Sequence, residues 1–153
     1  MLVVSDTSPI SALVQIGRAE LLRDLFGTVC IPMAVNDELS RFHSSLPSFI
    51  EVREVTDLAR VQSLLPSLDL GEAEAIVLAI QTQADHLLID ERRGRILASQ
   101  AGVPIIGLIG VLLLAKTRGL IPAVKDLLAE LQAKAGFYVA ESLIKNALQA
   151  AGE

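Results

Sequence analysis

The sequence predicts an α/β fold in which helices connect the strands of a parallel sheet. Apolar runs that are expected as strands occupy residues 2–5, 28–31, 50–55 and 86–89, with a weaker fifth run over 104–106. The segments between these runs have helical periodicity, and strands that alternate with helices are typical of parallel sheets with helical crossovers. Beyond residue 106 the pattern is helical only, so the sheet is expected in the amino-terminal part of the chain.

The length and composition predict a single domain over residues 1–153. A chain of this length that is 52% apolar can bury a sizeable core, and no repeat or linker divides it. Its richest apolar stretch, residues 103–115, is shorter than the roughly 20 residues of a membrane span. No signal-peptide pattern precedes the first strand, so a cytoplasmic location is expected. Cys30 is the only cysteine, which excludes an intramolecular disulfide and a cysteine-based metal cluster.

The charge of the chain narrows the classes of ligand. A formal net charge of −5 provides no general attraction for nucleic acid, so a polyanionic partner would need a cation to screen the acidic groups. A divalent metal ion is the simplest such cation. Aromatic residues make up only 3% of the chain, which disfavours the base-stacking platform of single-strand binding proteins.

In the amino-terminal half, turn residues separate the expected helices from the expected strands. Helices are predicted over residues 8–16, 18–26, 33–42 and 56–65, with the first two broken near Gly17. Pro32 is compatible with a helix start and Pro66 ends a helix, because proline lacks the amide hydrogen that helix interiors need. The polar stretch from Ser44 to Ser48 is expected to be a loop.

In the second half, helices are predicted over residues 71–83, 91–101, 107–117, 122–134 and 139–150. The last of these has an apolar stripe formed by Val139, Leu143, Ala147 and Ala150. Such a stripe packs against the parent domain or forms the contact of a homodimer. The helices over about 107–150 are therefore expected to pack on the domain or on a dimer mate.

The first strand brings a carboxylate to the expected ligand-binding edge of the sheet. The apolar run over residues 2–5 is followed by Asp6, and Thr7 or Ser8 is expected as the N-cap of a helix with Pro9 in its first turn. In open α/β sheets, ligands bind at the carboxyl ends of the strands. Asp6 could therefore hold a cation, act as a base or cap a helix.

A second acid is expected to face inward from the helix over residues 33–42. At about 100° per residue, Glu38 falls about 60° from Val35, at the edge of the apolar face, whereas Asp37 falls on the solvent side. Glu38 is thus expected to point toward the interior or a cleft, or to reach water from the rim.

Two glutamates lie in the helix that is expected to be most buried. Between Gly71 and Ile80, nearly every position other than Glu72 and Glu74 is apolar, so these carboxylates are costly unless they are used. They lie about 200° apart around the helix, so both cannot face one ion. Glu72 could serve the electrostatics of the helix start while Glu74 faces the site.

The strand over residues 86–89 repeats the arrangement found at Asp6, because it runs directly into Asp90 and Glu91. If the two strands are neighbours, their ends lie about 5 Å apart, and carboxylates that close repel unless a cation separates them or one is protonated. Asp90 could instead be the N-cap of the next helix, and Glu91 a first-turn acid or a second ligand.

Carboxylates from three separate segments are thus expected to converge at one edge of the sheet. Oxygen ligands without nearby cysteine or histidine favour Mg²⁺ or Mn²⁺ over zinc. The two histidines do not form a ligand pair, because His43 opens a polar loop and His86 begins a strand. Both are expected to be structural.

Four motifs occur in a fixed order along the chain. They are Asp6-Thr7-Ser8-Pro9, Ile31-Pro32-x-x-Val35-x-x-Glu38-Leu39, Gly71-Glu72-Ala73-Glu74-Ala75-Ile76 and Leu88-Ile89-Asp90-Glu91-Arg92-Arg93-Gly94-Arg95. This series resembles the PIN domain of metal-dependent ribonucleases, in the branch close to VapC-type toxins. Gly107-x-x-Gly110-x-Leu112-x-x-x-Lys116 and Gly152-Glu153 extend the similarity to the tail, and so over essentially the whole chain.

The resemblance implies a three-layer α/β/α sandwich with a pocket of three or four acids that holds Mg²⁺ or Mn²⁺. Asp6 matches the first acid of the family motif, and Glu38 matches the second. The third acid is usually an aspartate, and here Glu74 fits best, with Glu72 as the alternative. For the fourth acid, Asp90 fits by residue type and Glu91 by position.

The predicted function is therefore metal-dependent hydrolysis of RNA phosphodiester bonds by an endoribonuclease that is the toxin of a toxin–antitoxin pair. Arg92, Arg93 and Arg95 follow Asp90 and could hold substrate phosphates or form a solvated helix face. The resemblance also implies a small antitoxin protein as partner, and a homodimer is the expected assembly. The alternative is a PIN-fold binding or regulatory module with weak or no nuclease activity.

Overall fold

The computed structural model describes all of residues 1–153, with five strands and nine helices. The strands are β1 (Val3–Ser5), β2 (Val29–Ile31), β3 (Ile50–Val52), β4 (His86–Leu88) and β5 (Ile105–Ile106). The helices are α1 (Thr7–Gln15), α2 (Glu20–Phe26), α3 (Met33–Phe42), α4 (Leu58–Leu64), α5 (Leu70–Thr82), α6 (Arg92–Gln100), α7 (Leu108–Thr117), α8 (Val124–Ala135) and α9 (Glu141–Ala150). None of the helices combines the length and the apolar character that a membrane span requires.

All five strands belong to one parallel sheet with the order β3-β2-β1-β4-β5. The central strand β1 pairs on one side with β2, where Val3 lies opposite Val29. On its other side it pairs with β4, where Val3 lies opposite His86 and Ser5 opposite Leu88. The chain winds from β1 to β3 in one direction and continues through β4 and β5 in the other, so the strand order reverses between β1 and β4. Such a reversal opens a crevice at the carboxyl ends of the strands. We call this end of the sheet the carboxyl edge.

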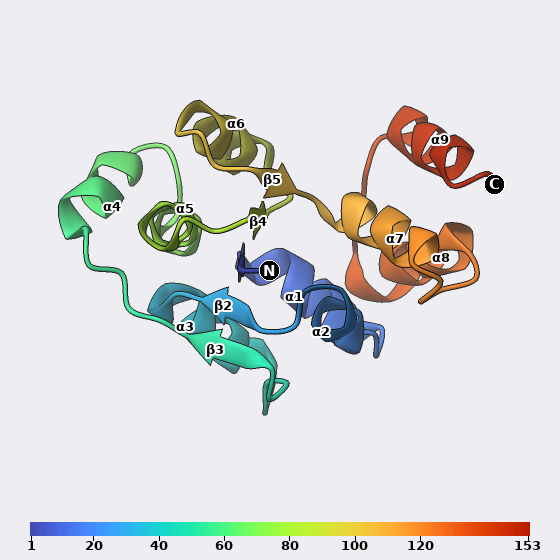
Figure 1. The fold of residues 1–153 in the computed structure, drawn as a ribbon, viewed down its shortest axis with the longest axis horizontal. Coiled ribbons are helices and arrows are strands. Elements are labelled where there is room, and N and C mark those ends of the chain that lie inside the picture. The colour runs from blue at the N-terminus through green and yellow to red at the C-terminus, as the bar shows by residue number, and fades with distance from the viewer.

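Neighbouring residues of the central strands face two different hydrophobic cores, because successive side chains of a strand point to opposite faces. Val3 and Leu88 belong to the core that α1, α2, α7 and α8 cover. Val4 and Leu87 belong to the core under α4, α5 and α6. Figure 1 shows these two sets of helices on opposite sides of the strands. The expected three-layer α/β/α sandwich is therefore confirmed.

The carboxyl-terminal helices differ in how deeply they are packed. Leu112 of α7 and Leu131 of α8 are fully buried in the core. Helix α9 has one buried residue, Ala147, and packs Ile144 and Leu148 against the same core. Figure 1 shows α9 beside α7, at the edge of the molecule where the chain ends. The apolar side of α9 is thus at least partly used within the chain itself.

Strand β3 is three residues shorter than the sequence pattern predicts, whereas each of the other four strands lacks one predicted residue. Strand β3 ends at Val52 and does not extend to residue 55. Beyond it, the side-chain amide of Gln81 donates to the carbonyl oxygen of Glu54 at 3.1 Å, and its oxygen accepts from the amide of Thr56 at 2.8 Å. A side chain of α5 therefore satisfies backbone groups that a longer strand would have paired with the sheet.

Candidate metal centre

Asp6 lies at the carboxyl end of β1, and its side chain is only 5% exposed. Its backbone amide donates to the carbonyl oxygen of Leu88 at 2.9 Å, which extends the pairing of β1 with β4 by one residue. Asp6 is the N-cap residue of α1, although its side chain makes no cap hydrogen bond. This corrects the expectation that Thr7 or Ser8 would be the N-cap. The Asp6 carboxylate is therefore free of the capping role.

The environment of Asp6 disfavours a negative charge. Burial raises the pKa of Asp6 to about 7, and the backbone amide of Thr7 offsets only part of this rise. The negative charges of Asp69, Glu38 and Asp90 raise the pKa further. These four acids are thus close enough to interact, and a cation among them would relieve the repulsion.

Glu38 reaches the carboxyl edge from the middle of α3. It is half-buried, whereas its neighbour Asp37 is exposed, in agreement with the helical periodicity. The hydroxyl of Thr7 donates to Glu38 Oε2 at 2.6 Å, which connects α3 to the start of α1. On the other side, a Cβ atom added to Gly71 would lie 3.1 Å from Glu38 Cδ and would contact its Oε1. The absence of a side chain at Gly71 lets α5 approach this carboxylate closely.

Glu72 is the more deeply buried of the two glutamates in α5, with 8% of its surface exposed. Its Oε1 atom accepts from the amide of Asp69 at 3.5 Å, and its own amide donates to Asp69 Oδ1 at 2.8 Å. Its Oε2 atom is buried without any hydrogen-bond partner. The pKa of Glu72 is raised, mainly by burial and then by its contacts with Asp69 and the charge of Asp6. The side chain therefore offers an unused oxygen near Asp6.

Glu74 has a different role in this arrangement. Its Oε1 atom accepts a hydrogen bond from the backbone amide of Ala34 at 3.0 Å. Ala34 lies in the first turn of α3, whose N-cap residue, Pro32, has no side-chain oxygen to offer. Glu74 thus satisfies a free amide of α3, and its negative charge interacts favourably with the positive end of the α3 dipole. Of the two glutamates, the structure brings Glu72 to Asp6 and turns Glu74 to the start of α3.

Asp90 lies at the carboxyl end of β4 and stabilises the start of a distant helix. Its Oδ1 atom accepts from the amide of Leu108, the first residue of α7, at 3.0 Å. The N-cap of α6 is Glu91, whose carboxylate accepts from the amide of Arg93 at 3.5 Å. Asp90 therefore does not cap α6, and Glu91 is exposed at the rim. Burial raises the pKa of Asp90, while the Leu108 amide and Arg95 oppose that rise.

The three arginines that follow Asp90 occupy different environments. Arg95 is half-buried and donates from Nη1 to the carbonyl oxygen of Ile89 at 2.7 Å. Arg92 and Arg93 are exposed in the first turn of α6, and Arg93 donates to the hydroxyl of Ser67 at 3.1 Å. Cations in the first turn of a helix oppose its dipole, so these two arginines do not serve the stability of α6.

The acids fit a hard divalent cation by their chemistry, and they are not yet closed around one. No three side chains among the histidines, cysteines, aspartates and glutamates have the spacing of a metal site. The available donors are all oxygens, one of them the unpartnered Oε2 of Glu72. Buried carboxylates with raised pKa values and a free oxygen fit Mg²⁺ or Mn²⁺ by their chemistry.

Sequence reasoning missed one acid of this cluster, Asp69. It is the N-cap residue of α5 and the strongest of the charges that raise the pKa of Asp6. The signal was present in the sequence, because an Asp three residues before a Glu is the spacing of a capping box. Helix α5 accordingly starts one residue earlier than the pattern predicts.

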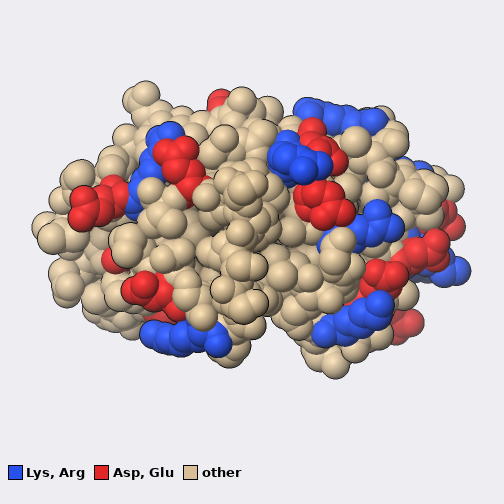
Figure 2. Space-filling model, turned by 90° about the horizontal axis from the view of Figure 1, so that it is seen from below, with Lys and Arg blue, Asp and Glu red and all other residues tan.

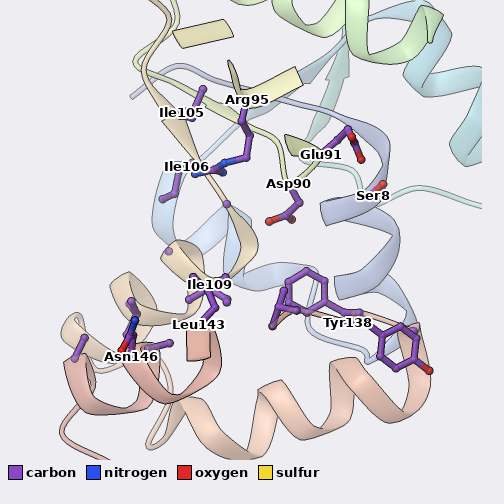
Figure 3. Close-up of a pocket in the computed structure, with 18 residues that line it drawn as sticks. Ser8, Asp90, Glu91, Arg95, Ile105, Ile106, Ile109, Tyr138, Leu143 and Asn146 are labelled. Carbon is purple, nitrogen blue, oxygen red and sulfur yellow. The ribbon is translucent and has the colours of Figure 1, made fainter. Parts of the chain in front are cut away.

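An apolar groove of about 960 Å³ leads away from the carboxyl edge. The residues labelled in Figure 3 line it: Ser8, Asp90, Glu91, Arg95, Ile105, Ile106, Ile109, Tyr138, Leu143 and Asn146. Figure 3 shows the acidic residues at one end and the α9 residues Leu143 and Asn146 at the other. Leu143 is half exposed along this groove. The groove thus joins the candidate metal centre to the carboxyl-terminal helix.

The surface has no single basic region on the face drawn in Figure 2. Lysine and arginine side chains lie there beside acidic ones, with wide uncharged areas between them. This distribution agrees with the net charge of −5. A polyanion would find little general electrostatic attraction on this face.

The fold and the site together define an α/β protein with an acidic ligand site at the point where the strand order reverses. Residues 2–153 match the family model described as a PIN domain. The chain therefore belongs to the PIN domain family, which is a nuclease-type fold, and the predicted family is confirmed at this level. Among curated proteins, none matches the chain.

Proposed function

We propose that this protein is a Mg²⁺- or Mn²⁺-dependent endoribonuclease that acts in the cytoplasm as the toxin of a toxin–antitoxin pair. The observation that carries the proposal is the group of buried acids at the carboxyl edge, in which Asp6 has a pKa of about 7 and Glu72 has an oxygen without a partner. Such a group is costly without a ligand, and strongly perturbed carboxyls in a cleft indicate a functional site.

In the proposed mechanism, the residues that would hold the metal ion are Asp6, Glu38, Glu72 and Asp90. The sequence favoured Glu74 as the third ligand. We assign Glu72 because its Oε2 is buried without a partner and its charge interacts with that of Asp6, whereas Glu74 is turned to the Ala34 amide at the start of α3. When bound, the ion lowers the pKa of a water molecule and neutralises charge on the reacting phosphate.

The protein's other groups position the ligands and the substrate. The Thr7 hydroxyl orients Glu38 by its hydrogen bond of 2.6 Å. Arg92 and Arg93, exposed beside the site, bind the phosphates that flank the scissile bond. Water attack does not require the 2′-hydroxyl, so RNA preference depends on contacts outside the acids.

The proposed partners are a small antitoxin protein and a second copy of this chain. The groove of Figure 3 supports an antitoxin segment that is mainly apolar, because ten of its eighteen lining residues are hydrophobic. Asp90 and Glu91 outnumber Arg95 among the charged lining residues, which favours a basic side chain at that end of the segment. The homodimer is proposed through the remaining surface of α9, a helix with a single buried residue, Ala147.

Cleavage assays on matched variants test the proposed activity. With Mn²⁺ and a structured RNA, Asp6→Asn and Glu38→Gln are expected to cut at least roughly 100-fold more slowly than the wild type, because each removes a ligand charge. Asp37→Asn is the control, since it changes the neighbouring, exposed acid of α3 and is expected to cut normally. EDTA is expected to abolish cleavage, and a DNA substrate run in parallel measures the preference for RNA.

Two outcomes would overturn the proposal. Full activity of Asp6→Asn would mean that the cleavage comes from another site or a contaminant. A wild type that binds RNA but does not cut it with either metal would favour the PIN-fold binding or regulatory module.

A further inference from the structure

The capping box at the start of α5 holds a buried glutamate, which is unusual for this motif. In a capping box, two side chains satisfy backbone amides at an exposed helix start. Here Asp69 Oδ1 accepts from the Glu72 amide at 2.8 Å, and Glu72 Oε1 accepts from the Asp69 amide at 3.5 Å. Asp69 is exposed, as is typical of a capping box, but Glu72 is buried, with only 8% of its surface exposed. One oxygen of a buried carboxylate is therefore fixed by the box.

The second oxygen of Glu72 is held in place from the opposite side. A Cβ atom added to Gly94 of α6 would lie 3.2 Å from Glu72 Oε2 and 2.6 Å from Cδ1 of Ile89. Helix α6 thus approaches this oxygen closely at a residue that has no side chain. Oε2 is left buried and unpartnered. Helix capping alone does not explain this arrangement, since an exposed glutamate would cap the amide equally well.

We propose that Asp69 is a positioning residue. Its Oδ1 accepts from the Glu72 amide and so fixes the helix start, where the Asp69 backbone amide contacts Glu72 Oε1 and Oε2 stays free for the metal ion. This inference rests on the proposed metal-dependent function. Asp69 acts through Glu72 and does not itself have to touch the ion. Outer partners of this kind fix ligand orientation, and their removal costs about 10- to 100-fold in metal affinity.

Substitutions of Asp69 separate positioning from charge. Asp69→Ala removes both the side-chain oxygen and the charge. Asp69→Asn removes the charge but keeps an oxygen that caps a helix about as well as aspartate does. Asp69→Gly also removes the side chain, but glycine is nearly as favourable as aspartate at a helix N-cap. It replaces the alanine variant in the experiment if that variant fails to fold.

Asp57 provides a matched control within the same chain. It is the N-cap residue of α4, its Oδ1 accepts from the Arg60 amide at 3.1 Å, and it is exposed. It belongs to no part of the candidate metal centre. Asp57→Ala therefore removes an aspartate cap without touching the proposed ligands, and it measures what the loss of a cap does by itself.

The experiment is a calorimetric titration of the purified full chain with Mn²⁺, which measures the metal affinity. Asp69→Ala and Asp69→Gly are expected to weaken binding about 10- to 100-fold. Asp69→Asn and Asp57→Ala are expected to stay within about threefold of the wild type, because the first keeps the cap and the second lies elsewhere. In cleavage assays, the Mn²⁺ concentration for half-maximal activity should rise for Asp69→Ala, while the KM for RNA does not change.

The outcomes distinguish this inference from the proposed function. Wild-type affinity in Asp69→Ala, or an equal loss in Asp57→Ala, would overturn the positioning role alone. An Asp69→Asn variant as weak as Asp69→Ala would also overturn it, in favour of a role for the charge of Asp69. A wild type that binds no Mn²⁺ would overturn the proposed function and the inference with it.

Discussion

The carboxylates at the carboxyl edge and the carboxylate of Glu153 show opposite responses to their surroundings. Glu153 accepts hydrogen bonds from Lys116 Nζ at 2.8 Å, from the Val124 amide at 2.7 Å and from the Lys125 amide at 3.0 Å. These partners, above all Lys116, lower the pKa of Glu153 to about 2. It joins the end of the chain to the start of α8 and the last turn of α7, and Lys116 also donates to the Ala151 carbonyl at 2.6 Å.

Asp6 and Glu72 have no such partners. No lysine or arginine is among the groups that shift their pKa values, and both values are raised because burial outweighs the few hydrogen bonds they accept. Acidic side chains thus have all the hydrogen-bond donors they need at one place in the molecule and lack them at another. A carboxylate with donors around it stabilises the fold, whereas a buried carboxylate without them costs stability and is free to bind a ligand.

The two glutamates of α5 allow the sharpest test of this difference. Glu72→Gln is expected to reduce Mn²⁺-dependent cleavage by roughly 100-fold or more, because it removes the charge of a proposed ligand. Glu74→Gln keeps an oxygen that can accept from the Ala34 amide and is expected to cut nearly normally. Cleavage rates and Mn²⁺ affinities of the two variants measure the effect. Equal losses in both would show that the contrast drawn between these two acids is wrong.

Asp6 should make the metal-free protein less stable as the pH rises. Its pKa is about 7 in the folded chain and about 4 when unfolded, so between these values only the folded state keeps the proton. In EDTA, the free energy of unfolding is therefore expected to fall from pH 4 to pH 7, by about 4 kcal/mol at most.

The Asp6→Asn variant checks this prediction, because it should lose the Asp6 share of the pH dependence and be more stable than the wild type in EDTA at pH 8. The shares of Glu72 and Asp90, whose pKa values are also raised, should remain. Added Mn²⁺ should stabilise the wild type and not the variant. Urea denaturation at several pH values, with and without Mn²⁺, measures both effects. A wild-type stability that does not change over this pH range would contradict the environment described for Asp6.

The Glu153 contacts predict the opposite pH dependence. Because the folded pKa of Glu153 is lowered, its stabilising contribution is present above about pH 4.5 and is lost as the pH falls toward 2. Lys116→Met, which removes the charged donor, is expected to lower the free energy of unfolding at pH 7, by less than the Asp6 effect described above. Thermal unfolding at pH 7 and pH 3 should show a smaller difference between variant and wild type at the lower pH. A constant difference would argue against the ion pair.

The smallest expected effect concerns the exposed arginines beside the acids. Arg92→Ala and Arg93→Ala are each expected to raise the KM for RNA by about threefold with little change in kcat, since exposed charges are well screened. Raising the salt concentration should shrink this difference. Lys145→Ala, which removes an exposed cation on α9, is the control and should leave the KM unchanged. A large loss of kcat would instead give the arginines a role at the reacting phosphate.

The sequence alone was sufficient for the fold and for the position of Asp6. Each apolar run, helix start and proline acts locally, and the alternation of strands and helices leaves few topologies open. Asp6 and Asp90 follow buried strands, and parallel strands end at the same edge, so their meeting could be predicted without coordinates. The inward direction of Glu38 followed in the same way from the periodicity of a single helix.

Only the tertiary structure decided which acids lie free and which are bound by the protein itself. Periodicity gives the angle between Glu72 and Glu74, but the rotation of α5 depends on its packing against α3 and α6. That packing brings the Ala34 amide, 40 residues away in the chain, to Glu74 and leaves Glu72 Oε2 without a partner. Asp90 likewise meets the Leu108 amide 18 residues further on, and not the helix beside it. Hydrogen bonds between distant segments depend on where whole elements pack, and no local pattern in the sequence contains that information.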